Sequence, residues 1–341
     1  MRTPKFISPS QLNTWDKDPE EYYLKYLSDT PPPRMKQTQP MSVGSSFDAY
    51  TKAAIHKRII DDGDPQFEFS TIFDKQVEEH NRDWALKAGA FAFKCYIESG
   101  AFGELIKHLE SLEIAPSMEQ TDAGTPDGPI CGDPDGPGPV VLLGIPDLWW
   151  VTDSGTNVIF DWKVNGFCSA SGMAPAPGYV KCSDGWGDKV YPNVPHSRGH
   201  GGPHRDVSLI YEDGMTLSME PMLQKQKPDW AIQTSVYSWL AGARVGSEIV
   251  VAIDQLACKP RLPHQPLIRV AQHRSNITEN FQMKTYARFQ ELWDIVHSDH
   301  IFRKMTKEQS QERCATLDDL CKGLEGDTPQ DEWFRSILGR H

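Results

Sequence analysis

The sequence has no long hydrophobic run and no closely spaced pair of cysteines. None of its 341 residues lies in a stretch approaching the ~18 consecutive apolar residues that a membrane-spanning helix needs, so we expect no membrane partner. The first eight residues contain no apolar segment of the secretory type, and we therefore expect a cytoplasmic protein. The seven cysteines are scattered without a C-x-x-C motif, which favours reduced thiols over a disulfide framework.

Positive charge is also scarce. The chain has 35 lysines and arginines against 47 aspartates and glutamates, giving a net charge of −12 at pH 7. An acidic chain repels polyanions over long range, so binding to nucleic acid requires a local basic groove or metal ions, and we expect the affinity to fall steeply with salt. The remaining composition, 38% hydrophobic and 24% charged, is typical of globular proteins and excludes a fully disordered chain.

The pattern of apolar and turn-forming residues predicts helices, then strands, a helix, two strands and helices again. This order indicates a mixed α/β fold, with a central mixed β-sheet flanked by helices. Helices are expected at 8–30, 44–60, 71–99, 102–112, 228–243 and from 276 onward, strands at 140–145, 147–151, 157–164, 248–257 and 266–273, and an exposed loop at 115–139.

We expect a single domain over residues 1–341. It would have a helical N-terminal part (1–114), a core (140–273) and a helical C-terminal part (275–341). The core is interrupted by a long insertion rich in glycine and proline at 165–228, and a connection of this length is usually functional or mobile.

The tripeptide Asp161-Trp162-Lys163 is the most informative part of the sequence. On a strand, Asp161 and Lys163 project from the same face, whereas Trp162 points to the other layer. A carboxylate beside an ammonium on an otherwise apolar strand needs a reason, because burying such a pair is costly. One alternative remains open, namely a solvated ion pair on an edge strand.

Asp147 strengthens the functional interpretation. It follows a Gly144-Ile145-Pro146 bend between two apolar strands, and antiparallel neighbours bring side chains on one face within about 5 Å. Asp147 and Asp161 would then meet beside Lys163. Two carboxylates this close repel each other unless a proton or a cation intervenes, and Mg²⁺ commonly binds one or two carboxylates while keeping several waters.

These residues resemble a known family. Gly-Ile-Pro-Asp ending at Asp147, thirteen residues, and then Asp-Trp-Lys match the pattern of PD-(D/E)XK nucleases, in particular their RecB-like branch, which includes many phage exonucleases. Three further segments match that branch in order. They are the opening segment 8–26, the segment 44–48, which stands where the branch has G-x-x-x-H, and the Q-x-x-x-Y pair Gln233 and Tyr237.

The resemblance implies a restriction-endonuclease-like core and a metal-dependent DNA nuclease. Its family-level expectation is an exonuclease in DNA processing or recombination, with a recombination partner protein and a phage origin. The cofactor would be Mg²⁺ or Mn²⁺. The roles carried over are Asp147 and Asp161 as catalytic metal ligands, the backbone carbonyl of Trp162 as a further ligand, Lys163 as the catalytic lysine, and Gln233 and Tyr237 as DNA contacts.

The sequence departs from the family pattern in two places. Position 48 is aspartate where the branch has histidine, and Asp48 is also a suitable ligand for a hard cation. Some relatives carry an iron–sulfur cluster, but here Asp18 replaces the early cysteine. The C-terminal cysteines, Cys314 and Cys321, are too few and too far apart, so we expect no cluster.

Two other classes of function stay open. A non-catalytic DNA-binding or scaffold module would keep the fold without the chemistry. A zinc-organised protein, which we consider the weaker alternative, would use the cysteines and histidines of the insertion: Cys168, Cys182, His196, His200 and His204. The insertion also carries basic and aromatic residues suited to a lid over a DNA strand: Lys181, Trp186, Lys189, Tyr191, Arg198 and Arg205. A second basic stretch, from Lys259 to Arg274, could flank the site.

Overall fold

The structure, a computed structural model, has a mixed sheet covered by helices, which confirms the predicted mixed α/β class. It describes residues 2–60, 63–118, 122–126, 137–153, 155–165, 180–183, 189–190, 207–210, 216–219, 223–259, 267–298, 302 and 308–309. In this part the main sheet has seven strands, in the spatial order β1 (Ser117–Met118), β4 (Leu148–Val151), β5 (Asn157–Asn165), β10 (Ile249–Lys259), β11 (Leu267–Ile277), β6 (Val180–Ser183) and β7 (Lys189–Val190). The β5–β10 pair is parallel, and the other pairs are antiparallel.

The described helices precede β1, lie between β9 (Thr216–Met219) and β10, or follow β11. They are α1 (Pro9–Lys17), α2 (Pro19–Tyr22), α3 (Gln39–Ile55), α4 (Phe69–Gln76), α5 (Arg82–Glu98), α6 (Ala101–Ser111), α8 (Leu223–Gln226), α9 (Pro228–Leu240) and α10 (Glu279–Val296). Shorter π and 3-10 turns occupy Tyr23–Leu27, His56–Ile60, Pro65–Phe67 and Glu79–Asn81. Within the described residues, no helix combines the length and the apolar character required to cross a bilayer.

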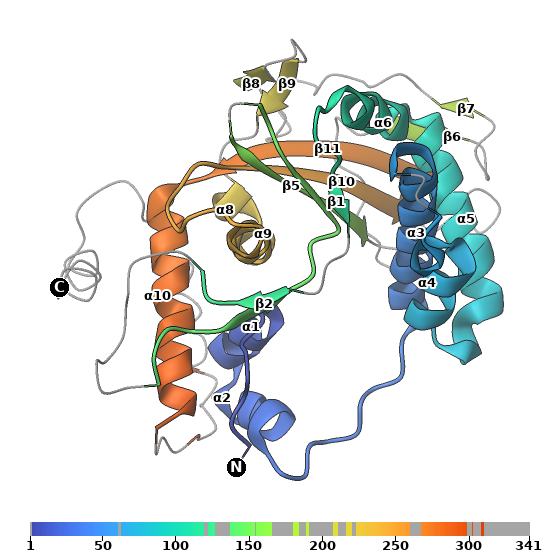
Figure 1. The fold of residues 1–341 in the computed structure, drawn as a ribbon. Helices are drawn as coiled ribbons and strands as arrows, with labels where there is room; N and C mark the ends of the chain where they lie inside the picture. Colours follow the sequence, from blue (N-terminus) through green and yellow to red (C-terminus); the bar gives the residue numbers. More distant parts are fainter. Residues whose placement is uncertain are drawn as a thin grey trace.

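Strand β10 separates two hydrophobic layers. Its odd-numbered residues Ile249, Val251 and Ile253 pack with α1, α9 and α10, whereas Val250 and Ala252 pack with α3, α5 and α6. This alternation follows from the period of two of a β-strand. Figure 1 shows α9, α10 and α1 on one side of the curved sheet and α3, α4 and α5 on the other.

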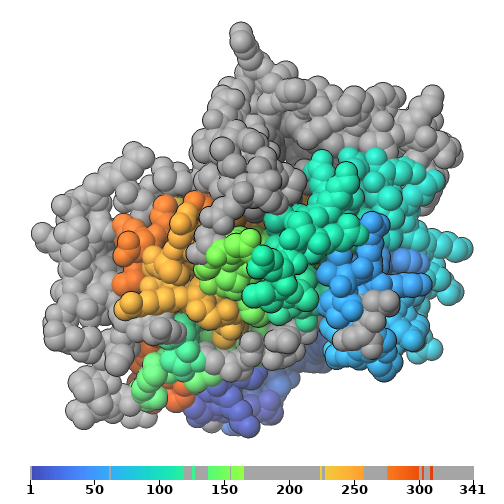
Figure 2. Space-filling view, turned by 45° about the horizontal axis from the view of Figure 1, so that its top comes forward, coloured from blue at the N-terminus to red at the C-terminus, as the bar shows by residue number. Residues whose placement is uncertain are grey.

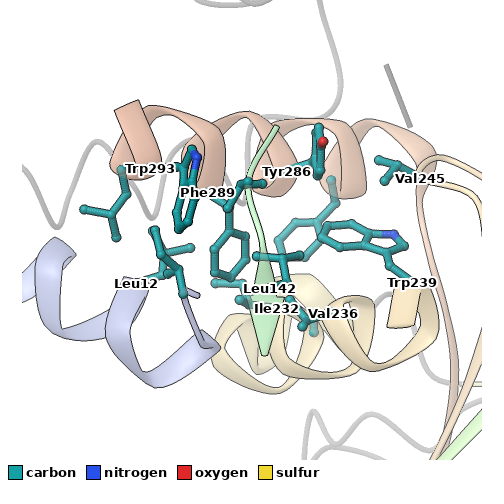
Figure 3. Close-up of a cluster of buried hydrophobic side chains, with 14 of the residues drawn as sticks. Leu12, Leu142, Ile232, Val236, Trp239, Val245, Tyr286, Phe289 and Trp293 are labelled. Atoms are coloured by element: carbon teal, nitrogen blue, oxygen red, sulfur yellow. The ribbon is translucent and has the colours of Figure 1, made fainter. Parts of the chain in front are cut away.

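The layer under α9 and α10 is rich in large side chains. Figure 3 shows α10 lying across α9 and α1, with Phe289 and Trp293 of α10 facing Leu12 of α1, and Leu142 between the helices. Ser8 caps α1 by accepting a hydrogen bond from the amide of Gln11 at 3.4 Å, and Pro9 follows in the first turn, as the sequence predicts. This packing fixes α9 against the sheet and so fixes the position of the residues that α9 presents to the site.

Three predicted elements are wrong in extent. The single helix at 8–30 is divided into α1 and α2, because Asp18 leaves the helical conformation and caps a new helix at Pro19. The single helix at 71–99 is divided into α4 and α5, because Val77 and Glu78 are extended. The helix expected from 44 begins at Gln39, where Pro40 stands in its first turn.

The strand predicted at 140–145 forms, but it does not join the main sheet. Residues Leu142–Gly144 (β3) pair with β2 (Asp122–Gly124) and bridge to Ile7. Val140 and Leu142 of this run belong to the hydrophobic layer under α9 and α10, with Val141 packed against it. The predicted loop 115–139 therefore contributes two short strands, β1 and β2. Two more, β8 (Val207–Ile210) and β9 (Thr216–Met219), pair within the insertion.

Figure 2 shows the green segment around residues 140–165 between the teal helical side and the yellow and orange residues of α9 and β10.

Gly89 lies where α5 packs closely against α3. A Cβ at this position would lie 2.1 Å from Ser46 Oγ, 2.5 Å from Ser46 Cβ and 3.0 Å from the backbone nitrogen of Phe47. We expect Gly89→Ala to destabilise the protein by about 2–3 kcal/mol, because two helix backbones must separate. Gly103→Ala in α6 is the matched control. A Cβ there meets nothing within 4 Å, so we expect a gain of about 0.5–1 kcal/mol from helix propensity. Urea unfolding measures both, and equal effects would contradict the close-packing argument.

Candidate active site

The hairpin of β4 and β5 places two aspartates opposite each other. Leu148 pairs with Phe160, so Asp147, one residue before β4, stands opposite Asp161. The two carboxyl groups lie so close that each shifts the pKa of the other. The backbone amide of Trp162 also donates to Asp147 Oδ2 at 3.4 Å. The structure therefore brings together the two carboxylates that the sequence predicts to meet.

Lys163 lies on the same face of β5 as Asp161, also as predicted. Its Nζ is 2.5 Å from Asp161 Oδ2 and donates a hydrogen bond to Gln233 Oε1 of α9 at 2.8 Å. Phe160 and Trp162 pack in the opposite layer, against α3, α5 and α6. The pair is not a solvated edge pair, because β5 lies inside the sheet and Asp161 is only 2% exposed.

Gln233 and Tyr237 are one turn apart on the inner face of α9. Gln233 Nε2 donates to the Tyr237 hydroxyl at 2.6 Å, so both ends of its amide are used. Gly144 permits this approach of α9, since a Cβ on Gly144 would lie 2.8 Å from the Tyr237 ring. Both predicted residues therefore reach the site. The contact that the structure gives to Gln233 is with Lys163, and contact with DNA remains a prediction for both.

Asp48 reaches the site through a residue that sequence reasoning missed. Lys52, one turn along α3, is 2% exposed, and its Nζ lies 2.9 Å from Asp48 Oδ2 and 3.0 Å from Asp147 Oδ1. Gln76 Nε2 also donates to Asp48 Oδ2 at 2.9 Å. The sequence did contain a signal that could have identified Lys52, because the i, i+4 spacing of Asp48 and Lys52 places both side chains on one helix face. Asp48 as a metal ligand stays a prediction.

The three carboxyl groups have different proton affinities. Burial, together with the nearby charge of Asp147, raises the pKa of Asp161 to about 7 despite the attraction of Lys163. Burial likewise raises the pKa of Asp48 to about 6. The pKa of Asp147 is lowered because the attraction of Lys52 and Lys163 outweighs its burial. Asp161 is therefore the more readily protonated of the two facing acids.

This arrangement predicts a pH dependence of stability in the absence of metal. Because the folded state holds the Asp161 proton up to about pH 7, it binds more protons than the unfolded chain between about pH 4 and pH 7, and stability from this group falls as pH rises. Asp161→Asn removes this loss. Between about pH 5 and pH 8 we expect the wild type to lose about 2–3 kcal/mol more than the variant, measured by urea unfolding with a chelator. Identical pH profiles would contradict the raised pKa.

A second polar cluster lies on the opposite side of β5 from Asp161 and Lys163. Tyr96 of α5 donates a hydrogen bond to Asp254 Oδ2 of β10 at 2.5 Å and accepts one from Trp162 Nε1 at 3.2 Å. Asp254 is fully buried. These bonds anchor the Trp162 ring and thereby hold the backbone between Asp161 and Lys163 in place.

Several predicted residues lie outside the described part of the structure. They include four of the five proposed zinc ligands (Cys168, His196, His200 and His204), most of the proposed lid residues and the two C-terminal cysteines. Cys182, Lys181 and Lys189 lie on β6 and β7, but their side chains, like those of 259–274, are outside the described part. Among the described residues, no group of three or more histidines, cysteines, aspartates or glutamates is arranged to hold a metal ion.

Comparison with known proteins assigns the chain to no family. No family model matches the chain, and no curated protein sequence is significantly similar to it. The geometry of the site and the motifs that it brings together are therefore what indicates a function for the chain.

Proposed function

We propose that this chain is a magnesium-dependent DNA nuclease of the PD-(D/E)XK type that hydrolyses phosphodiester bonds. One observation carries the proposal. Asp147 and Asp161, which lie on either side of β4 and the turn that follows it, meet opposite each other beside Lys163, whose ammonium is 2.5 Å from Asp161 Oδ2. Two adjacent acids beside a lysine, one of the acids buried, are typical of a functional site, because a bound cation relieves the repulsion between the two carboxylates.

The topology supports a restriction-endonuclease-like core. The β4–β5 hairpin carries both acids, and the chain then returns through α9 to β10, which pairs parallel with β5. The crossover helix α9 supplies Gln233 beside Lys163. The hairpin and then α9 thus carry the Asp147, Asp161-Trp162-Lys163 and Gln233–Tyr237 motifs in the order in which they occur in the sequence.

The donor set suits a hard divalent cation. Mg²⁺ in enzymes is commonly held by one or two carboxylates and waters, so a pair of acids is sufficient. Asp147 and Asp161 would hold the ion, with the Trp162 carbonyl as the further expected ligand. Bound there, magnesium would supply Lewis-acid activation of a water and of the scissile phosphate.

The residues of the chain provide the rest of the chemistry. Asp161 must lose its proton before it can act as a ligand, and its pKa of about 7 permits this at neutral pH. Lys163 carries a positive charge beside that carboxylate, where it would orient the attacking water or stabilise charge on the phosphate. Gln233 holds the Lys163 ammonium toward α9 and limits its motion.

Incubation of the full-length protein with labelled DNA tests the proposal. We expect cleavage with Mg²⁺ or Mn²⁺ and none with a chelator. A linear duplex, a single strand and a covalently closed circle should be compared, since the family-level expectation of an exonuclease predicts that the closed circle resists. Tight metal binding without cleavage of any substrate would favour a non-catalytic module, and one tightly bound zinc per chain would favour the zinc-organised alternative.

A further inference from the structure

The ammonium of Lys52 occupies a place that a cation would otherwise take. It is 2% exposed, comes from α3, and lies within 3.0 Å of carboxylate oxygens of both Asp48 and Asp147. A buried lysine held by two acids is a fixed positive charge whose position is set by its partners. Gln76 donates to the same oxygen of Asp48 and so holds that acid toward Lys52.

The charges of the site count against more than one divalent ion. With all three aspartates ionised, three negative charges face the two positive charges of Lys52 and Lys163. These five side chains then carry a net charge of −1. One divalent ion reverses this to an excess of one, whereas two ions would leave an excess of three at close quarters before any phosphate arrives.

We propose that Lys52 is a built-in second cation, which fills the position between Asp48 and Asp147 and limits the site to one divalent ion, held by Asp147 and Asp161. The inference rests on the proposed function, because it assumes that this pair binds a metal. It assigns Asp48 to holding Lys52 rather than to direct coordination. Lys52 is thus a positioning residue that neutralises one side of Asp147 and leaves its other side to the ion.

Removal of the ammonium should open a second site. Lys52→Met leaves the oxygens of Asp48 and Asp147 that the ammonium now occupies, and hard cations prefer such oxygens. Lys52→Arg keeps the charge and is the matched control. Lys52→Gln is a second uncharged variant that can still hydrogen-bond to both acids, in case the methionine variant does not fold.

Counting bound Mn²⁺ tests this inference in the full-length protein. The free-ion signal in electron paramagnetic resonance gives the ions bound per chain, and the ions lost in Asp147→Asn identify those at the site. We expect one ion for the wild type and Lys52→Arg, and two for Lys52→Met and Lys52→Gln. Two ions in the wild type, or one ion bound with unchanged affinity in both uncharged variants, would overturn the inference and leave the nuclease proposal standing. No ion at the site in the wild type would overturn both.

Discussion

Asp161→Asn should reduce magnesium-dependent DNA cleavage by a factor on the order of 10³ or more. The substitution keeps the size of the side chain and mimics the protonated acid, so the β4–β5 hairpin should fold as before. It removes the negative charge of one of the two proposed metal ligands, which lies 2.5 Å from Lys163. The rate of release of labelled nucleotides from a linear duplex under single-turnover conditions measures the effect.

The control for this variant is Asp153→Asn. Asp153 lies in the turn between β4 and β5, is exposed, and makes no described contact with the site. We expect its cleavage rate to stay within a factor of about two of the wild type, as for a surface substitution away from the site. Cleavage by Asp161→Asn at the wild-type rate would remove Asp161 from the mechanism.

Lys163→Met should lower the rate of cleavage by a factor of about 10²–10³ and leave metal binding in place. The methionine fills a similar volume but removes the charge that faces Asp161 and the proton donor to Gln233. Because the loss affects the chemical step, we expect kcat to fall while the Mn²⁺ affinity changes little or increases, since a competing positive charge is gone.

Lys227→Met is the matched control for this lysine. Lys227 is exposed at the start of α9, where its ammonium lies over the Trp230 ring at 5.4 Å from the ring centroid. We expect wild-type rates for it. If Lys163→Met also cleaves at the wild-type rate, the amine has no part in the chemistry and the arrangement around Gln233 is structural.

The local periodicity of strands was enough to predict the central pair of the site. Asp161 and Lys163 are two residues apart on β5, so their common face follows from the geometry of any strand. The meeting of Asp147 with Asp161 followed from a short turn and an antiparallel register. The presence of Gln233 and Tyr237 on one helix face was likewise local, although the bond from Lys163 to Gln233 depends on how α9 packs on the sheet.

Long-range contacts account for what the sequence did not reveal. Lys52 is separated from Asp147 by 95 residues, and only the packing of α3 beside the hairpin brings the two together. The break between α4 and α5 has a similar origin. Glu78 hydrogen-bonds through its backbone and its carboxylate to Gln37, 41 residues away, which favours an extended backbone where the local pattern favours a helix.

The location of a bound divalent ion tests the central claim most directly. Crystals of the full-length protein grown or soaked with Mn²⁺ give an anomalous signal that marks the ion without reference to activity. We predict a single peak in contact with carboxylate oxygens of both Asp147 and Asp161, beside Lys163 and with Lys52 still between Asp48 and Asp147. A crystal that holds manganese elsewhere on the protein, with no peak between Asp147 and Asp161, would contradict the account.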